Sequence, residues 1–234
     1  MLAMRKLGKK GRFANQLLQY AYLRIQSGDD YQCPPWIGQE LFGLQDPPVT
    51  NGTPELTYKF SLNAGFYAPY KDKIREWFTP ADSKKYYSDI YDNAIENGCT
   101  LIGLHLRRGD YGTFKRKSAR WCFVAPVEWY LEWLEENTER FDKPILVIAT
   151  DEPELRKEFS DYRVIENGPA TDCYYDFYAL TRCDVLLISN STFGFAASML
   201  NTRAKEFYRP RLSLKKLVPY NPWSDPLVLR DERY

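Results

Sequence analysis

The second half of the chain alternates between short apolar runs of strand length and segments in which apolar residues recur at helical spacing. Most connections between these segments are short, as is usual in strand–helix–strand units. Parallel strands need a crossover, usually a helix, so the alternation favours a parallel sheet wound on both sides by helices. The expected strands are 100–106, 144–150, 162–165, 184–189 and 205–208, and the expected helices are 127–139, 153–159, 174–183 and 193–200.

The first half of the chain gives a weaker pattern. Its beginning predicts a short strand, a turn between Gly8 and Gly11, and a helix that ends at a glycine, which together resemble a nucleotide-type βα unit. Proline-rich irregular chain and two further helices follow. We therefore expect an α/β protein with two domains, residues 1–98 and 99–234. The elements expected in the first domain are a strand at 2–7 and helices at 13–26, 70–78 and 81–97.

The most informative motif reads IGLHLRRGDY, from Ile102 to Tyr111. An apolar strand here leads into His105, the only histidine of the chain, and then into Arg107 and Arg108. Open α/β sheets bind ligands at the carboxyl ends of their strands. Arginine stays charged at any working pH, and its planar fork fits two phosphate oxygens at once. The motif therefore predicts a diphosphate site, with a solvated pair of arginines as the alternative.

Polar residues also follow two other expected strands. The segment Ser189–Thr192 lies between a buried strand and an apolar helix, and the free N–H groups of a helix N-terminus attract phosphate. The alternative is simple N-capping by Ser191 or Thr192. Asp151 is expected either to cap the next helix or to bond a ribose or base edge. Asp176, one turn into a helix, is expected to accept from guanine ring nitrogens unless it is a solvated carboxylate.

Charge, cysteines and hydropathy limit the classes of partner. Lys+Arg number 32 and Asp+Glu 31, giving a formal charge of +1, which is not the basic field that nonspecific nucleic-acid binding uses. The five cysteines include no Cys-x-x-Cys pair, which argues for reduced thiols and against structural zinc. No apolar run approaches the roughly 20 residues that cross a bilayer, and no signal peptide is visible. We expect a soluble, cytoplasmic chain without a transmembrane segment.

Several blocks of the sequence resemble α1,2-fucosyltransferases. GRFANQLLQYA at 11–21 resembles the GRLGNQMFQYA block near the start of that family, and HLRRGDY at 105–111 matches its His-x-Arg-Arg-Gly-Asp-Tyr block. Residues 176–200 resemble a third block, and ATDEPELRKEF at 149–159 is more similar to a block of the related α1,6-fucosyltransferases. The resemblance implies a GT-B fold of two facing Rossmann-like domains. It also implies an inverting transfer of fucose from GDP-fucose to a hydroxyl of a glycan acceptor, with no cofactor and no metal; the chain has no Asp-x-Asp motif to hold one.

The resemblance implies roles for single residues. Arg107 would contact the β-phosphate and stabilise the leaving GDP, where negative charge develops. His105 and Asp176 would lie near the guanine, and Ser191 and Thr192 near the phosphates. The residues expected to bind the donor are Gly11, Asn15, His105, Arg107, Asp151, Asp176, Ser191, Thr192 and Phe193.

The general base does not carry over from the resemblance, because Lys115 stands near the place where the α1,6 relatives have a glutamate. Asp110 is the nearest candidate. We expect it to pair with Arg108, which would depress its pKa and weaken it as a base. The long basic loop 112–126 follows directly and is expected to cover the anion site.

Two alternatives stay open. The first is the transfer of another GDP- or nucleotide-activated deoxysugar, such as rhamnose. The chain is also compatible with a noncatalytic nucleotide-sugar or glycan-binding module, or with one domain of a larger glycosyltransferase. The segment before His105 is shorter than is usual in the family, so the sequence does not indicate the acceptor.

Overall fold

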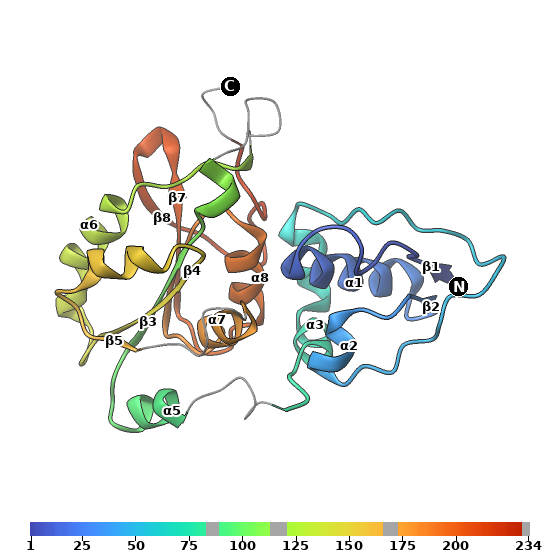
Figure 1. Cartoon of the computed structure of the whole chain (residues 1–234), viewed down its shortest axis with the longest axis horizontal. Coiled ribbons are helices and arrows are strands. Elements are labelled where there is room, and N and C mark those ends of the chain that lie inside the picture. The colour runs from blue at the N-terminus through green and yellow to red at the C-terminus, as the bar shows by residue number, and fades with distance from the viewer. Residues whose placement is uncertain (83–88, 113–120, 166–172, 231–234) are drawn as a thin grey trace. The chain divides into compact units, whose positions relative to one another are not determined.

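The structure is a computed structural model that describes residues 1–82, 89–112, 121–165 and 173–230 (Figure 1). The chain divides into two compact units, one of residues 1–83 with 223–227 and one of residues 84–222 with 228–234. Helix α5 (Asp89–Glu96) belongs to the second unit. It lines a groove there together with strand residues such as Val164, and Asp92 on it pairs with Arg182 at 3.3 Å. The division therefore lies before α5, whereas the sequence placed it after residue 98.

The second unit is built on a six-stranded sheet with the order β5-β4-β3-β6-β7-β8. The first five strands in this order run parallel to their neighbours, and β8 runs antiparallel to β7. The parallel part confirms the expected α/β class, while β8 was not predicted. The strands are β3 (Leu101–Leu106), β4 (Ile145–Thr150), β5 (Val164–Ile165), β6 (Val185–Ile188), β7 (Glu206–Arg211) and β8 (Lys216–Pro219).

Helices cover both faces of this sheet, with α6 (Glu128–Asn137) on one side and α8 (Thr192–Leu200) on the other (Figure 1). All six residues of β3 are buried, which explains why its sequence is apolar throughout rather than alternating. Its even-numbered residues, Ile102 to Leu106, join the core cluster with Tyr130 and Leu134 of α6. Its odd-numbered residues face the opposite layer, so His105 is directed to the side that α8 covers.

The layer opposite α6 also contains α7 (Cys173–Leu180), which approaches β3 closely at Gly103. A Cβ atom at Gly103 would lie 2.7 Å from Leu186 Cδ2 and 3.0 Å from Leu180 Cδ2. The expected helices at 127–139, 174–183 and 193–200 are confirmed as α6, α7 and α8; α6 and α7 are shorter than expected, and α8 begins one residue earlier. The segment 153–159 forms a 3-10 helix, η6 (Pro153–Phe159), and the expected helix at 81–97 is represented by α5, since 83–88 lie outside the described residues.

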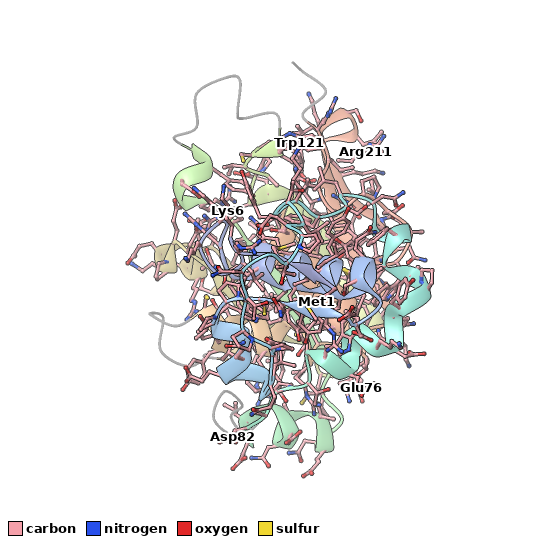
Figure 2. All side chains as sticks on the ribbon, turned by 90° about the vertical axis from the view of Figure 1, so that its right-hand side faces the viewer. Met1, Lys6, Glu76, Asp82, Trp121 and Arg211 are labelled. Carbon is pink, nitrogen blue, oxygen red and sulfur yellow. The ribbon has the colours of Figure 1, made fainter. Side chains whose placement is uncertain are left out.

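The first unit has a small parallel sheet of β1 (Leu2–Ala3) and β2 (Tyr31–Gln32), joined by α1 (Phe13–Ser27). The helix ends at Gly28, which adopts a left-handed conformation with φ 62°, as the sequence predicted. Charged side chains such as those of Lys6 and Asp82 lie on the surface of this unit (Figure 2). The remaining helices are α2 (Ile37–Phe42), η1 (Ala64–Phe66), η2 (Ala68–Tyr70) and α3 (Lys71–Trp77).

A hydrogen-bonded carboxylate ties α1 and β2 to the proline-rich chain. Asp46 Oδ1 accepts from Tyr20 Oη at 2.7 Å and from Tyr31 Oη at 2.6 Å. Its other oxygen accepts from Gln39 Nε2 at 2.9 Å and from Trp36 Nε1 at 3.3 Å. Burial by itself would raise the pKa of Asp46, but the bonds that Tyr31, Tyr20, Gln39 and Trp36 donate outweigh it and lower the pKa.

Candidate functional site

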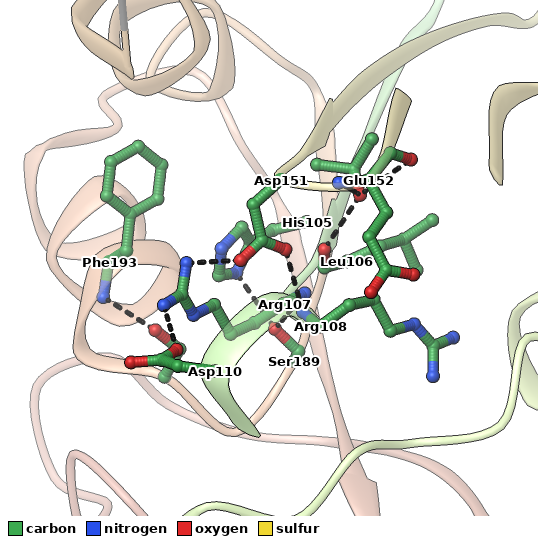
Figure 3. Close-up of polar contacts among 11 residues, drawn as sticks. His105, Leu106, Arg107, Arg108, Asp110, Asp151, Glu152, Ser189 and Phe193 are labelled. Atoms are coloured by element: carbon green, nitrogen blue, oxygen red, sulfur yellow. Dashed lines mark hydrogen bonds and ion pairs between the residues drawn. The ribbon is translucent and has the colours of Figure 1, made fainter. Parts of the chain in front are cut away.

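The carboxyl ends of three neighbouring parallel strands meet at one edge of the second unit's sheet. Leu106 at the end of β3 is in register with Thr150 at the end of β4, and His105 is in register with Ile188 at the end of β6. The residues that follow these ends therefore lie side by side (Figure 3). They are Arg107 and Arg108 after β3, Asp151 after β4, and Ser189 after β6.

Arg107 is held by two carboxylates (Figure 3). Its Nη1 lies 2.5 Å from Asp151 Oδ2, and its Nη2 contacts Asp110 Oδ1. The ring of Tyr111 lies beside the guanidinium, with 5.2 Å between its centroid and the guanidinium carbon. The side chain is 15% exposed. The guanidinium is thus aligned to contact two oxyanions at once, which is the geometry that a diphosphate also offers.

The structure gives Asp110 a different partner from the expected Arg108. The 3-10 turn η3 (Gly109–Gly112) follows the arginines and returns Asp110 to the side of Arg107, three residues earlier. The side chain of Arg108 extends away from that of Arg107 in Figure 3. Its Nε and Nη2 atoms are buried and have no hydrogen-bond partner among the described residues.

Asp151 braces the chain that leaves β3. Its Oδ1 accepts from the Arg108 backbone N–H at 2.8 Å, while Oδ2 pairs with Arg107. Gly109, at φ +33°, permits this close approach, because a Cβ atom there would lie 2.5 Å from Asp151 Oδ2. Asp151 therefore does not act as the helix cap that was one of its two expected roles; the N-cap of η6 is Glu152. Its contact with a ribose or base stays a prediction.

His105 is a buried, neutral imidazole. It is 4% exposed, and its ring lies 5.2 Å from the ring of Phe193 at an interplanar angle of 32°. Its Nδ1 atom is 3.1 Å from Ser189 Oγ. Burial lowers the pKa of His105 to about 4, against the smaller opposite effect of the Asp151 charge. The close approach of α8 depends on Gly194, where a Cβ atom would lie 2.6 Å from Nδ1.

The N-terminus of α8 lies at the same edge of the sheet. Ser191 is its N-cap and accepts from Phe193 N at 3.3 Å, so the capping interpretation is confirmed and remains compatible with phosphate binding. Thr192 is the first helical residue and is half-buried. The Phe193 ring contacts Phe177 of α7 with centroids 5.2 Å apart, and Asp176 precedes Phe177 on that helix. The guanine contact expected of Asp176 stays a prediction.

The structure gathers most of the predicted site residues into the second unit: His105, Arg107, Asp110, Asp151, Ser191 and Phe193. Gly11 and Asn15 belong to the first unit, where Gly11 has φ +78° and a Cβ atom on it would lie 2.7 Å from Asn15 Cβ. Positions 113–120 of the basic loop that was expected to cover the site lie outside the described residues.

Sequence reasoning gave no separate role to Ser189 and Tyr111. Ser189 Oγ accepts from the Arg107 backbone N–H at 3.0 Å, and Tyr111 contacts Arg107 and also bonds Ser191. The signal for Ser189 is its place directly after a buried strand, and that for Tyr111 is its place within the arginine motif. Among the residues that the structure describes, no three His, Cys, Asp or Glu side chains are grouped so that they could hold a metal ion.

The family model of "Glycosyl transferase family 11" matches residues 30–206, which include the parallel strands β3, β4, β5 and β6 and the residues that follow their carboxyl ends. The chain belongs to glycosyltransferase family 11. Within the described ranges of this family 11 chain, no helix is both long enough and apolar enough to span a membrane.

Curated relatives of this family 11 chain include galactoside alpha-(1,2)-fucosyltransferase 1 of Homo sapiens. It is 25% identical over 177 residues, which are 70% of this chain and 46% of the relative. The protein of the same name from Alouatta belzebul matches with the same identity and the same coverage. The chain thus spans about half the length of the curated relatives it matches.

Solved structures with the same fold include POFUT1 in complex with GDP-fucose, with a TM-score of 0.57 at 12% identity over 89% of this chain and 97% of that chain. An Arabidopsis thaliana FUT1 mutant in complex with GDP has a TM-score of 0.59 at 10% identity over 92% and 71% of the two chains. The predicted GT-B type of α/β fold for the family 11 chain is therefore confirmed.

Proposed function

We propose that this family 11 chain transfers fucose from GDP-fucose to a hydroxyl of a glycan acceptor. The observation that carries the proposal is the position of Arg107, whose guanidinium fork is fixed at the carboxyl end of the central parallel strand, within the matched family region. The names of the curated relatives support the sugar and the reaction, since they are alpha-(1,2)-fucosyltransferases. GDP-fucose in a solved structure of the same fold supports the donor.

Arg107 would contact the β-phosphate and neutralise the charge that grows on GDP as the glycosidic bond breaks. Two carboxylates now occupy its two Nη atoms, so two phosphate oxygens can replace them without a change in the fork. The interaction strengthens as the leaving group gains charge, so it favours the transition state over the bound donor. The N-terminal turn of α8, with Ser191 and Thr192, would add N–H donors and the positive end of a helix dipole.

The nucleotide base would lie by His105, Phe193 and Asp176. A neutral imidazole provides one hydrogen-bond donor and one acceptor, and the adjoining Phe193 ring provides an apolar surface. Asp176 would accept from the ring N1–H and the adjacent exocyclic amino group of guanine, a pair of donors that cytosine and uracil do not present. These contacts would make the site more selective for the guanine nucleotide than for the hexose.

An inverting transfer needs a base beside the acceptor hydroxyl, and Asp110 is our candidate. It pairs with Arg107 in the structure, and a diphosphate on Arg107 would release it. The freed carboxylate would then accept the hydroxyl proton while the acceptor oxygen attacks the anomeric carbon and GDP departs. The proposal includes inversion at the anomeric carbon and independence of a metal ion. Arg107 and the α8 N-terminus would supply the positive charge that stabilises the departing GDP.

The test is transfer of radiolabel from GDP-fucose to a panel of galactose-terminated oligosaccharides in EDTA. NMR of the product determines whether the anomeric configuration is opposite to that of the donor. We expect acceptor-dependent transfer that Arg107→Ala abolishes. Arg140→Ala is a matched control, because Arg140 also pairs with a carboxylate, Glu206 at 2.6 Å, and lies over an aromatic ring, but at the amino end of β7. Binding of GDP without transfer to any acceptor would favour a noncatalytic nucleotide-sugar module.

A further inference from the structure

A chain of hydrogen bonds joins the ends of β3 and β6 and fixes where protons reside. The Arg107 backbone N–H lies 3.0 Å from Ser189 Oγ, and Ser189 Oγ lies 3.1 Å from His105 Nδ1. Ser189 is 2% exposed and His105 is 4% exposed. Water therefore has little access to these groups, and each donor in the chain needs a partner within the protein.

The direction of each bond follows from the chemistry of the groups. A backbone N–H can only donate, so Ser189 Oγ accepts from Arg107. The hydroxyl proton of Ser189 then needs an acceptor, and among the described residues His105 Nδ1 is the one within reach. Nδ1 must therefore carry a lone pair. In a neutral imidazole the proton is then on Nε2.

Nε2 has no hydrogen-bond partner among the described residues, although the ring is more than nine-tenths buried between the sheet and Phe193. Nε2 is not among the side-chain atoms that are wholly shielded from solvent without a partner, so a ligand that brings an acceptor can reach it. It lies on the imidazole beside the Arg107 and Asp151 pair (Figure 3). The donor is therefore presented at the edge of the sheet where the nucleotide is proposed to bind.

We propose that Ser189 is a positioning residue that holds His105 as the Nε2–H tautomer, so that the imidazole donates a hydrogen bond to an acceptor atom of a nucleoside diphosphate. The identity of that ligand rests on the proposed function, whereas the tautomer is a property of the free protein. The opposite tautomer, with Nδ1–H donating to Ser189, would leave the buried hydroxyl proton without an acceptor among the described residues.

The chain has one histidine, so its ring nitrogens are observed without assignment ambiguity. We would label the full chain with ring-¹⁵N histidine and record long-range nitrogen–proton correlations at neutral pH without ligand. Protonated and unprotonated ring nitrogens resonate far apart, and their couplings to the ring protons identify each atom. The proposal predicts a protonated Nε2 and an unprotonated Nδ1. A protonated Nδ1, or a rapid mixture of both tautomers, would overturn it, whether or not any variant folds.

Ser189→Ala removes the hydroxyl and should convert the single tautomer into a mixture. The Kd for GDP should rise between about twofold and tenfold, the equivalent of one hydrogen bond. Ser189→Thr restores a hydroxyl and should restore the single tautomer. Ser198→Ala is the matched control, because Ser198 is a fully buried serine of α8 that bonds Gly194 O and Tyr220 rather than His105.

The outcomes separate this inference from the proposed function. A fixed Nε2–H tautomer that Ser189→Ala abolishes, without GDP binding by the wild type, would support the role of Ser189 and contradict the nucleotide site. GDP binding with an unchanged tautomer in Ser189→Ala would leave the nucleotide site standing and overturn the role of Ser189.

Discussion

Replacing Arg107 with lysine tests whether the guanidinium fork, rather than positive charge alone, binds the donor. In the structure, Nη1 and Nη2 of Arg107 reach different carboxylates, those of Asp151 and Asp110. Lysine keeps the charge but has a single nitrogen on a flexible stem, so it replaces at most one of two charge-assisted contacts to the diphosphate. Such a contact contributes about 1.5–3 kcal/mol, which predicts a rise in the Kd for GDP of roughly tenfold to a hundredfold.

Arg107→Ala should weaken the binding of GDP more than Arg107→Lys does. It removes both contacts and also leaves Asp110 and Asp151 as uncompensated carboxylates beside the diphosphate, where like charges repel. Isothermal titration calorimetry with GDP in EDTA measures each Kd, and urea unfolding checks that the variants fold. Arg140→Ala, which removes an arginine at the opposite edge of the sheet, should leave the Kd within about twofold of the wild type. A wild-type Kd in Arg107→Ala would refute the phosphate contact, and a wild-type Kd in Arg107→Lys would refute the fork argument.

Three further substitutions test the packing of α8, the buried carboxylate of the first unit and the hydrogen bonds of Asn190. Gly194→Ala would place a methyl group 2.6 Å from His105 Nδ1 and should lower the free energy of unfolding in urea by about 1–3 kcal/mol. A decrease below about 0.5 kcal/mol would show that α8 can shift to accommodate the methyl group. The pKa of Asp46 is lowered in the folded chain, so its carboxylate stabilises the first unit above the unfolded pKa of about 3.9 and stops doing so as the pH falls through the folded pKa. Asp46→Asn should therefore make the free energy of unfolding less dependent on pH below about pH 5, and parallel pH curves for both proteins would contradict this. The amide of Asn190 bonds the backbones of Trp121 and Leu229, so Asn190→Ala should lower stability by about 1–3 kcal/mol in urea unfolding, and an unchanged midpoint would exclude that role.

The sequence predicted the sheet of the second unit well, because its signals are local. Strands β3 and β4 are buried on both faces and read as continuous apolar runs. The helix α1 was predicted nearly to its last residue, since Gly28 provides a left-handed stop. Strand β8 was missed because it pairs antiparallel with β7 after a tight turn and does not follow a crossover helix.

The sequence predicted which residues of the candidate site are neighbours, but it did not predict which of them pair with each other. Parallel strands end at one edge, so the residues after β3, β4 and β6 were expected to be neighbours. The partners within that edge depend on the backbone after each strand: η3 turns Asp110 toward Arg107, and Gly109 allows Asp151 to approach. The contact of Asp151 with the Arg108 backbone joins residues 43 positions apart, and no local pattern specifies it. The division of the chain also depended on tertiary contacts, since α5 packs on the second unit.

The central claim is that the carboxyl edge of the β3–β4–β6 sheet binds a guanine nucleotide sugar. The most direct measurement is the melting-temperature shift of the purified chain against GDP, GDP-fucose, GDP-mannose, UDP and CDP, with EDTA in every sample. A ligand at a concentration of about 100 times its Kd stabilises the native state by about 2.7 kcal/mol, which a melting curve resolves. The account predicts a rise with GDP and GDP-fucose, none with UDP or CDP, and loss of the rise in Arg107→Ala. Equal shifts with all five nucleotides, or none with any of them, would contradict it.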